Sequence, residues 1–357
     1  MTAAPLTWSL CIATLNRVDA LHECIRWALA QTRPALEIIV VDAGTDWAAN
    51  RDRIAALMAG HSGPTLHYLP AQRRSTSAQR NQAIAAAAGD ILVMIDDDSF
   101  MYPDCVAALL THYESPQGAQ IAGVAAVHVP RAPDDRLIGL ERKQTGLTTL
   151  DGSEKRILGN PVLRWIYREI LMMAIDRDFV FYDPANRHVT PQDFAKLGQD
   201  NCYMTRLMPG YAFTVRRTVA LQELFEPVFQ SYSPAEDTDA SYRMSRHGFL
   251  LVARTARLHH AQAASGRIKR RQATALRLMN LAYVTRKHST GLGLRFGVFL
   301  ARRTLAECLK DLLARRWDFP QFRGALYAAR RIPTLFRHPA DDLERWYAAE
   351  QQRVLSQ

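Results

Sequence analysis

The most constraining feature of this chain is a short apolar run that ends in three consecutive aspartates, within Gly89–Phe100, GDILVMIDDDSF. The run Ile91–Ile95 is short and apolar, as expected for a buried strand. Three adjacent carboxylates repel one another and cost free energy unless positive charge lies among them. The segment therefore predicts a buried strand whose end holds a charged ligand, and a divalent cation is the simplest such ligand.

The first hundred residues alternate between strand-like and helix-like patterns, which favours a doubly wound α/β sheet with helices on both faces. In such sheets ligands bind at the carboxyl ends of the strands. Asp42 and the run Asp96–Asp98 fall at two of these ends. The expected strands are residues 8–15, 36–44, 65–69 and 91–95, and the expected helices are residues 20–31, 52–60 and 77–88.

Beyond residue 100 the pattern is less regular. We expect helices after Pro103 and within residues 235–247, strands at residues 120–129 and 249–255, and a strand followed by a helix within residues 210–225. Residues 131–205 lose the alternation, apart from a helix expected within residues 161–175, and we interpret them as an insertion on the core. From residue 266 onward the pattern is helical.

Composition indicates a packed, cytoplasmic chain. Of 357 residues, 48% are hydrophobic, which suits a globular core. The five cysteines are scattered and form no C-x-x-C pair, so a reducing compartment is expected. The start of the chain has no basic segment before its short apolar stretch, and no stretch approaches the roughly 20 apolar residues of a membrane span.

The basic charge is concentrated in the C-terminal region. Residues 266–357 contain 19 Lys and Arg against 7 Asp and Glu, or +12, which leaves −2 for residues 1–265 of the total of +10. Residues 292–317 interleave Leu, Phe and Trp with Arg at helical spacing, as in an amphipathic helix at an anionic membrane surface. An ordinary helical cap with a charged outer face explains the same pattern, and the sequence leaves both open.

The alternation of side chains along a strand predicts that Asp96 and Asp98 project together while Asp97 points away. Two carboxylates on one side suit Mg²⁺ or Mn²⁺, with open positions for diphosphate oxygens. The alternative is that Asp98 or Ser99 only caps the following turn.

Two further groups of polar residues are candidates for the same site. A helix is expected to begin near Glu236, and Asp237 could accept a proton from an attacking hydroxyl if it faces the same cleft. Carboxylates at a helix N-terminus also have a structural explanation, which includes pairing of Asp239 with Arg243. Adjacent His259 and His260 end the next strand and point to opposite sides, so at most one of them readily completes a metal site.

Taken together, the ordered motifs CIATLNR, IIVVDAG, SAQRNQAI, GDILVMIDDDSFMYPD, GYAFTVRR and EDTDASYRMSRHG resemble family 2 glycosyltransferases of the GT-A fold over residues 8–262. The resemblance implies a mixed, mostly parallel sheet flanked by helices. It implies a glycosyltransferase domain at residues 1–265, with residues 131–205 as the acceptor region and residues 266–357 as a basic helical extension.

The resemblance also implies roles for individual residues. The nucleotide-sugar contacts carried over are Thr14, Asn16, Arg17, Asp42, Arg80, Asn81, Asp96 and Asp97. Metal ligands are expected among Asp96, Asp98, His259 and His260, with Asp237 as the general base and Glu236, Asp239 and Arg243 as supporting residues. The second strand ends in VVDAGT, with one acid where many members have two, so contact between Asp42 and the base is less firmly implied.

The implied reaction is inverting transfer of a sugar, assisted by Mn²⁺ or Mg²⁺, from a UDP-, dTDP- or GDP-linked donor to a hydroxyl of a glycan or lipid-linked acceptor. A sugar nucleotidyltransferase is disfavoured because the first strand is followed by NRVD and not by a Gly- and Lys-rich loop. A non-catalytic peripheral membrane or nucleotide-binding protein remains an alternative. The acidic clusters disfavour nucleic acid as a partner.

Overall fold

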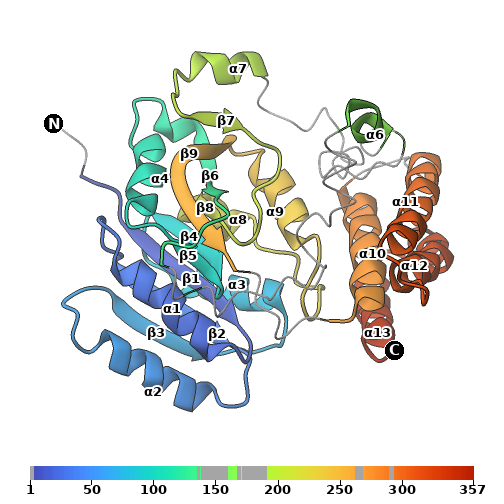
Figure 1. The fold of residues 1–357 in the computed structure, drawn as a ribbon, viewed down its shortest axis with the longest axis horizontal. Helices are drawn as coiled ribbons and strands as arrows, with labels where there is room; N and C mark the ends of the chain where they lie inside the picture. Colours follow the sequence, from blue (N-terminus) through green and yellow to red (C-terminus); the bar gives the residue numbers. More distant parts are fainter. Residues whose placement is uncertain are drawn as a thin grey trace. The chain divides into compact units, whose positions relative to one another are not determined.

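The computed structural model describes residues 4–134, 137, 160–166, 170, 191–261, 268–288 and 293–357 (Figure 1). The chain divides into two compact units. The first comprises residues 1–142, 187–227 and 237–266, and the second comprises residues 143–186, 228–236 and 267–357. The sheet belongs to the first unit, and the basic C-terminal helices belong to the second.

The first unit is built on a mixed sheet with the strand order β3-β2-β1-β4-β8-β6-β9-β5, and β7 pairs with β9 outside this path. The core β3-β2-β1-β4 is parallel, as are β6 and β9, whereas β8 runs antiparallel to both β4 and β6. The strands are β1 (Trp8–Thr14), β2 (Glu37–Asp42), β3 (Thr65–Pro70), β4 (Ile91–Asp96), β5 (Ser99–Met101), β6 (Ile121–His128), β7 (Cys202–Met204), β8 (Phe213–Arg216) and β9 (Phe249–His260).

Helices cover both faces of this sheet, which explains why its central strands are apolar throughout. In β4, the side chains of Ile91, Val93 and Ile95 join one buried cluster, and those of Leu92 and Met94 join the other. The first cluster includes side chains of α1 (Val18–Leu29), α2 (Trp47–Met58) and α4 (Cys105–Tyr113). The second includes side chains of α3 (Thr76–Ala86), α8 (Arg217–Gln222) and α9 (Glu236–Met244).

The carboxyl ends of three neighbouring strands bring polar residues to one edge of the sheet. Thr14 at the end of β1 is paired in register with Asp42 at the end of β2. On the other side of β1, Ala13 is in register with Asp96. This edge is where an α/β sheet binds ligands.

The short strand β5 turns the chain back from the aspartate run and pairs antiparallel with the end of β9, Ser99 opposite His260 and Phe100 opposite His259. The N–H group of Ala261 also donates to the carbonyl of Asp98 at 3.0 Å. These pairings bring residues about 160 positions apart in sequence together.

Four helices make up most of the described part of the second unit: α10 (Arg270–His288), α11 (Gly293–Leu313), α12 (Pro320–Arg337) and α13 (Leu343–Leu355). α10 packs against α12 and α13, and α11 packs against α12. Among the residues that the structure describes, no helix is long and apolar enough to span a bilayer.

The structure confirms the expected α/β fold and the order of its main elements. It differs from the sequence-based expectation in detail. β9 extends through His260 because β6 and β5 pair with successive parts of it, and β5 and β7 were not predicted. Of the helix expected within residues 161–175, α6 (Pro161–Trp165) is described, and most of the remainder lies outside the described residues.

Candidate active site

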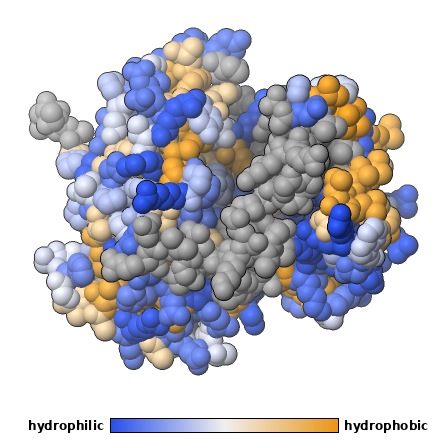
Figure 2. All heavy atoms as spheres, viewed as in Figure 1, coloured by the Kyte–Doolittle hydropathy of each residue, from blue (hydrophilic) through white to orange (hydrophobic). Residues whose placement is uncertain are grey.

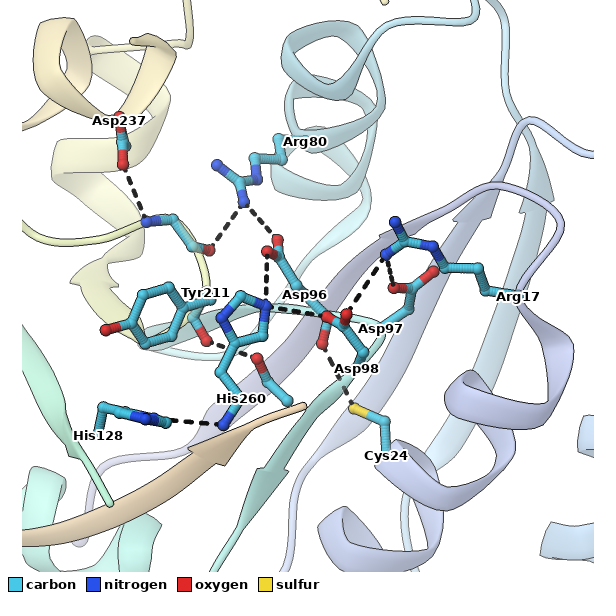
Figure 3. Close-up of polar contacts among 12 residues, drawn as sticks. Arg17, Cys24, Arg80, Asp96, Asp97, Asp98, His128, Tyr211, Asp237 and His260 are labelled. Carbon is cyan, nitrogen blue, oxygen red and sulfur yellow. Dashed lines mark hydrogen bonds and ion pairs between the residues drawn. The ribbon is translucent and has the colours of Figure 1, made fainter. Parts of the chain in front are cut away.

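Two aspartates and a histidine form a compact cluster at the carboxyl edge of the sheet (Figure 3). One side-chain atom each of Asp96, Asp98 and His260 can be chosen so that all three lie within 4.8 Å of one another. Nε2 of His260 is 3.1 Å from Oδ1 of Asp98 and 3.7 Å from Oδ2 of Asp96. Two carboxylates and an imidazole are a fitting donor set for Mn²⁺ or Mg²⁺.

The end of β4 and the turn that follows it explain how the aspartates separate, because β4 ends at Asp96, and Asp97 and Asp98 form the turn to β5. Asp96 continues the side of Leu92 and Met94, toward the face that α3 and α9 cover. Asp97, the first residue of this turn, points to the opposite side, toward Thr14 and the start of α1. The structure thus places Asp96 and Asp98 in one cluster and directs Asp97 elsewhere, as the sequence predicted.

Asp97 is held by the turn that follows β1. Its carboxylate accepts a hydrogen bond from the Thr14 hydroxyl at 2.7 Å and one from the Arg17 guanidinium at 3.0 Å. Burial raises the pKa of Asp97 to about 7, with Arg17 opposing the rise and Asp98 adding to it. Burial acts to lower the pKa of Arg17, but Asp97 and Asp98 outweigh burial and raise it. Arg17 also lies 3.6 Å from Asp98, so it places positive charge between two carboxylates.

Asp96, Asp98 and His260 are called the metal-type cluster below. Arg80 links this cluster to a loop before β8. Its Nη2 donates to Oδ1 of Asp96 at 3.0 Å and to the carbonyl of Gly210 at 2.8 Å. A Cβ atom at position 210 would lie 2.9 Å from Nη1 of Arg80, so a glycine lets the loop approach the guanidinium. The N–H of Gly210 donates to Oδ2 of Asp237 at 3.3 Å, which connects Arg80 to α9.

The acidic residues at the start of α9 have different surroundings. Asp237 is half-buried and faces the Gly210 loop, and its Oδ1 also accepts the Thr238 N–H at 2.8 Å. Asp239 is fully buried and pairs with Arg243 at 2.8 Å, so its role is structural. Glu236 is buried and belongs to the second unit. Asp237 is therefore the acid of this segment that the structure leaves partly exposed near the site.

The two neighbouring histidines are separated by the strand. The Nδ1 atom of His259 lies 3.0 Å from the carbonyl oxygen of Val129, and the His259 ring stacks on Phe100, away from the aspartates. His260 joins the aspartates, and its N–H donates to Nδ1 of His128 at 3.4 Å. Of the two candidates from the sequence, the structure brings His260 to the cluster.

The resemblance also singled out Asp42, Asn16 and Asn81, and the structure gives hydrogen-bond partners for Asp42 and Asn81. Buried Asp42 accepts hydrogen bonds from Tyr68 at 2.7 Å, Asn50 at 3.0 Å and the Gly44 N–H at 2.7 Å. Asn16 is exposed in the turn after β1, with a left-handed φ of 54°. The Asn81 amide exchanges two hydrogen bonds of 2.8 Å with the main chain of Phe225, a clamp between α3 and the segment after α8.

Comparison with known proteins assigns this architecture. The family model described as Glycosyl transferase family 2 matches residues 9–163, which include β1 through β6 and the aspartate run. Residues 9–163 are thus similar to the glycosyltransferases of family 2.

Two curated relatives are similar to parts of the chain. A glucosyl-dolichyl phosphate glucuronosyltransferase of Haloferax volcanii is 28% identical over 127 residues, which cover 35% of this chain and 40% of the relative. The succinoglycan biosynthesis protein ExoO of Rhizobium meliloti is 32% identical over 112 residues, 31% of this chain and 30% of the relative. The chain thus matches less than half the length of each relative.

Two solved structures share the fold over most of this chain. The mannosyltransferase PcManGT of Pyrobaculum calidifontis, solved with GDP-Man and Mn²⁺, aligns with a TM-score of 0.51 at 15% identity, over 99% of this chain and 86% of that chain. GalNAc-T7, solved with UDP, GalNAc and Mn²⁺, aligns with a TM-score of 0.50 at 14% identity, over 85% and 54%. The fold is the GT-A glycosyltransferase fold.

The sequence patterns did not single out Tyr211 or His128, which both lie beside His260. The motif GYAFTVRR indicated that this segment belongs to the site, but it did not indicate a role for Tyr211. The contact of Tyr211 with His260 depends on the pairing of β5 with the end of β9, which the motif does not encode. His128 gave no signal beyond being a histidine at the end of a strand.

Proposed function

We propose that this protein is a metal-dependent inverting glycosyltransferase that uses a nucleoside-diphosphate sugar, UDP-, dTDP- or GDP-linked. The observation that carries the proposal is the cluster of Asp96, Asp98 and His260 on a GT-A sheet, joined through Arg80 and Gly210 to Asp237. The acceptor is a hydroxyl of a glycan or a lipid-linked glycan. Residues 1–265 form the transferase, and residues 131–205 contribute to acceptor binding.

The proposed chemistry divides between two sides of the sugar. Asp96, Asp98 and His260 would hold a divalent cation, which would supply positive charge for the leaving diphosphate. Asp237 accepts the proton of the acceptor hydroxyl as its oxygen attacks the anomeric carbon from the opposite face. A single displacement inverts the anomeric configuration. Thr14, Asn16, Arg17, Asp42, Arg80, Asn81 and Asp97 form or support the nucleotide pocket.

A donor screen tests this function. The purified chain is incubated with UDP-, dTDP- and GDP-sugars and either Mn²⁺ or Mg²⁺, and release of nucleoside diphosphate is measured. We expect release from one nucleotide class, loss of release with EDTA, and recovery with excess Mn²⁺. With an acceptor, NMR of the product is expected to show the inverted anomer. Absence of release from every donor with both metals contradicts the proposal.

We further propose that the second unit binds the inner face of the cell membrane, where a lipid-linked acceptor is presented. The specific observation is an apolar stripe on α11 formed by Leu294, Val298, Leu305, Leu309 and Leu312, with exposed fractions of 85%, 45%, 55%, 38% and 40%. These positions lie within an arc of about 60° on the helix. Figure 2 shows hydrophobic surface in the area that α11 occupies in Figure 1.

The remainder of α11 fits a membrane surface as its partner. The opposite side of the helix is already buried through Phe296, Phe299 and Ala306, so the exposed stripe is a second apolar face. Exposed Arg295 and Arg302 border one side of the stripe, and Trp317, 72% exposed, follows the end of the helix. Apolar side chains bordered by Arg and Trp are typical of helices that lie in the interface of an anionic bilayer.

Replacing Leu305 and Leu309 together by Ser is expected to lower partition into phosphatidylglycerol vesicles about tenfold or more, because both side chains lose apolar burial. Co-sedimentation at low salt measures this, with Leu36→Ser, at a site 45% exposed in the first unit, as the control. Donor hydrolysis is expected to remain. The membrane assignment is contradicted if the double variant binds vesicles as the wild type does. It is also contradicted if the double variant converts a dimer to a monomer without an effect on vesicle binding.

A further inference from the structure

Tyr211 lies directly against the metal-type cluster. Its ring stacks on the His260 imidazole, with centroids 4.5 Å apart and planes 16° apart (Figure 3). The same ring meets His128 edge-on, with centroids 6.1 Å apart and planes at 81°. His128 in turn accepts the main-chain N–H of His260. The imidazole is therefore bordered by an aromatic face and supported at its backbone.

The segment that carries Tyr211 is fixed at several points. The Tyr211 carbonyl accepts the Ser99 hydroxyl at 3.0 Å, which ties the segment to β5 just after the aspartates. The preceding residue, Gly210, donates to Asp237 and accepts from Arg80. Because these contacts hold the main chain on both sides of the site, the Tyr211 ring has a defined position over His260.

The imidazole of His260 must be correctly oriented to act as a metal ligand. Its imidazole can rotate about two side-chain bonds, and only some orientations bring Nε2 toward Asp96 and Asp98. A stacked neighbour restricts the ring plane, and aromatic pairs gain about two- to tenfold in equilibrium constant beyond their buried area. Partners that orient a ligating histidine contribute to metal affinity in general.

We propose that Tyr211 is a positioning residue of the metal site, whose ring holds the His260 imidazole with Nε2 directed at the shared ligand position of Asp96 and Asp98. This inference rests on the proposed function, because it requires that the cluster bind a divalent cation. It adds to that function a residue that acts through another side chain and touches no reacting atom.

The Tyr211 hydroxyl contributes little to this role. The side chain of tyrosine is a phenol that carries its proton at neutral pH. A neutral phenol is a poor ligand for a divalent cation beside two carboxylates. The ring face is therefore the functional part, and Phe is expected to replace Tyr at this position.

The test measures Mn²⁺ affinity in the absence of nucleotide, from the electron paramagnetic resonance signal of free Mn²⁺. Tyr211→Leu removes the stacking ring and is expected to weaken binding about three- to tenfold. Tyr211→Phe keeps the ring and is expected to stay within about twofold of the wild type. If Tyr211→Leu does not fold, as judged by thermal denaturation, Tyr211→Met tests the same loss of aromaticity.

A double-mutant cycle shows whether Tyr211 acts through His260. In a His260→Ala background, Tyr211→Leu is expected to change Mn²⁺ affinity by less than about twofold, because the ring no longer has an imidazole to orient. An equal loss in both backgrounds overturns the inference in favour of general packing. Wild-type affinity in Tyr211→Leu also overturns it, while leaving the metal site intact. A wild-type chain that does not bind Mn²⁺ overturns the proposed function as well.

Discussion

Asp98→Asn is expected to eliminate measurable Mn²⁺ binding and to lower donor turnover by about a hundredfold or more. Asp98 is almost fully buried, and its Oδ1 lies 3.1 Å from Nε2 of His260, so its carboxylate contributes the least solvated charge of the cluster. An amide of the same shape retains the volume and loses the charge that attracts a divalent cation. Calorimetry with Mn²⁺, followed by the donor assay, measures both effects.

The control for this prediction is Asp104→Asn, which removes a carboxylate on an exposed part of the first unit, 3.4 Å from Arg257. That variant is expected to bind Mn²⁺ as the wild type does. A thermal shift adds an independent measure, because a cation that binds only the folded state raises its stability. Mn²⁺ is expected to raise the Tm of the wild type and of Asp104→Asn and to leave that of Asp98→Asn unchanged. Wild-type Mn²⁺ affinity in Asp98→Asn contradicts the metal assignment.

The sequence predicted the parts of the site that depend on one strand at a time. The apolar run before the aspartates identified β4. The two-residue period of a strand predicted that Asp97 separates from Asp96 and Asp98, and the structure shows this separation although Asp97 and Asp98 lie in the turn after β4. Because parallel strands end at the same edge, the meeting of β1, β2 and β4 could also be anticipated. These inferences need only local patterns and the general geometry of parallel sheets.

The parts that depend on pairing between distant segments could not be predicted in the same way. The choice of His260 over His259 follows from the register of β5 against β9, and no local pattern encodes that register. The position of Tyr211 follows from the same pairing, together with the contacts of Gly210. The partner of Asn81 could not be predicted either, because its two hydrogen bonds to the Phe225 main chain depend on the path of the segment after α8.

The structure also changes the electrostatic reasoning that the sequence suggested. Three adjacent aspartates predicted a need for nearby positive charge, and a metal ion was the simplest source. The protein itself supplies part of that charge, since Arg17 pairs with Asp97 and approaches Asp98, and Arg80 pairs with Asp96. The convergence of Asp96, Asp98 and His260, and not repulsion within the acidic run, therefore indicates a metal site.

Asp237→Asn is expected to lower kcat for sugar transfer by about 10²- to 10⁴-fold, the usual contribution of a positioned general base. The change removes the basic carboxylate and keeps an oxygen that can accept one of the main-chain hydrogen bonds from Thr238 and Gly210. Since Asp237 is half-buried and lies outside the metal-type cluster, folding, Mn²⁺ affinity and the donor KM are expected to stay near wild-type values.

Asp239→Asn on the same helix is the matched comparison for this prediction. Asp239 is fully buried and bonds Arg243 through Nε at 3.0 Å and Nη2 at 2.8 Å, so its variant leaves a largely buried guanidinium with a weaker partner. We expect it to lower the free energy of unfolding by about 1–3 kcal/mol while the folded fraction keeps its turnover. Steady-state kinetics beside chemical denaturation separates the two residues. If Asp237→Asn retains transfer within about threefold of wild type, or loses activity only in proportion to unfolding, Asp237 is not the base.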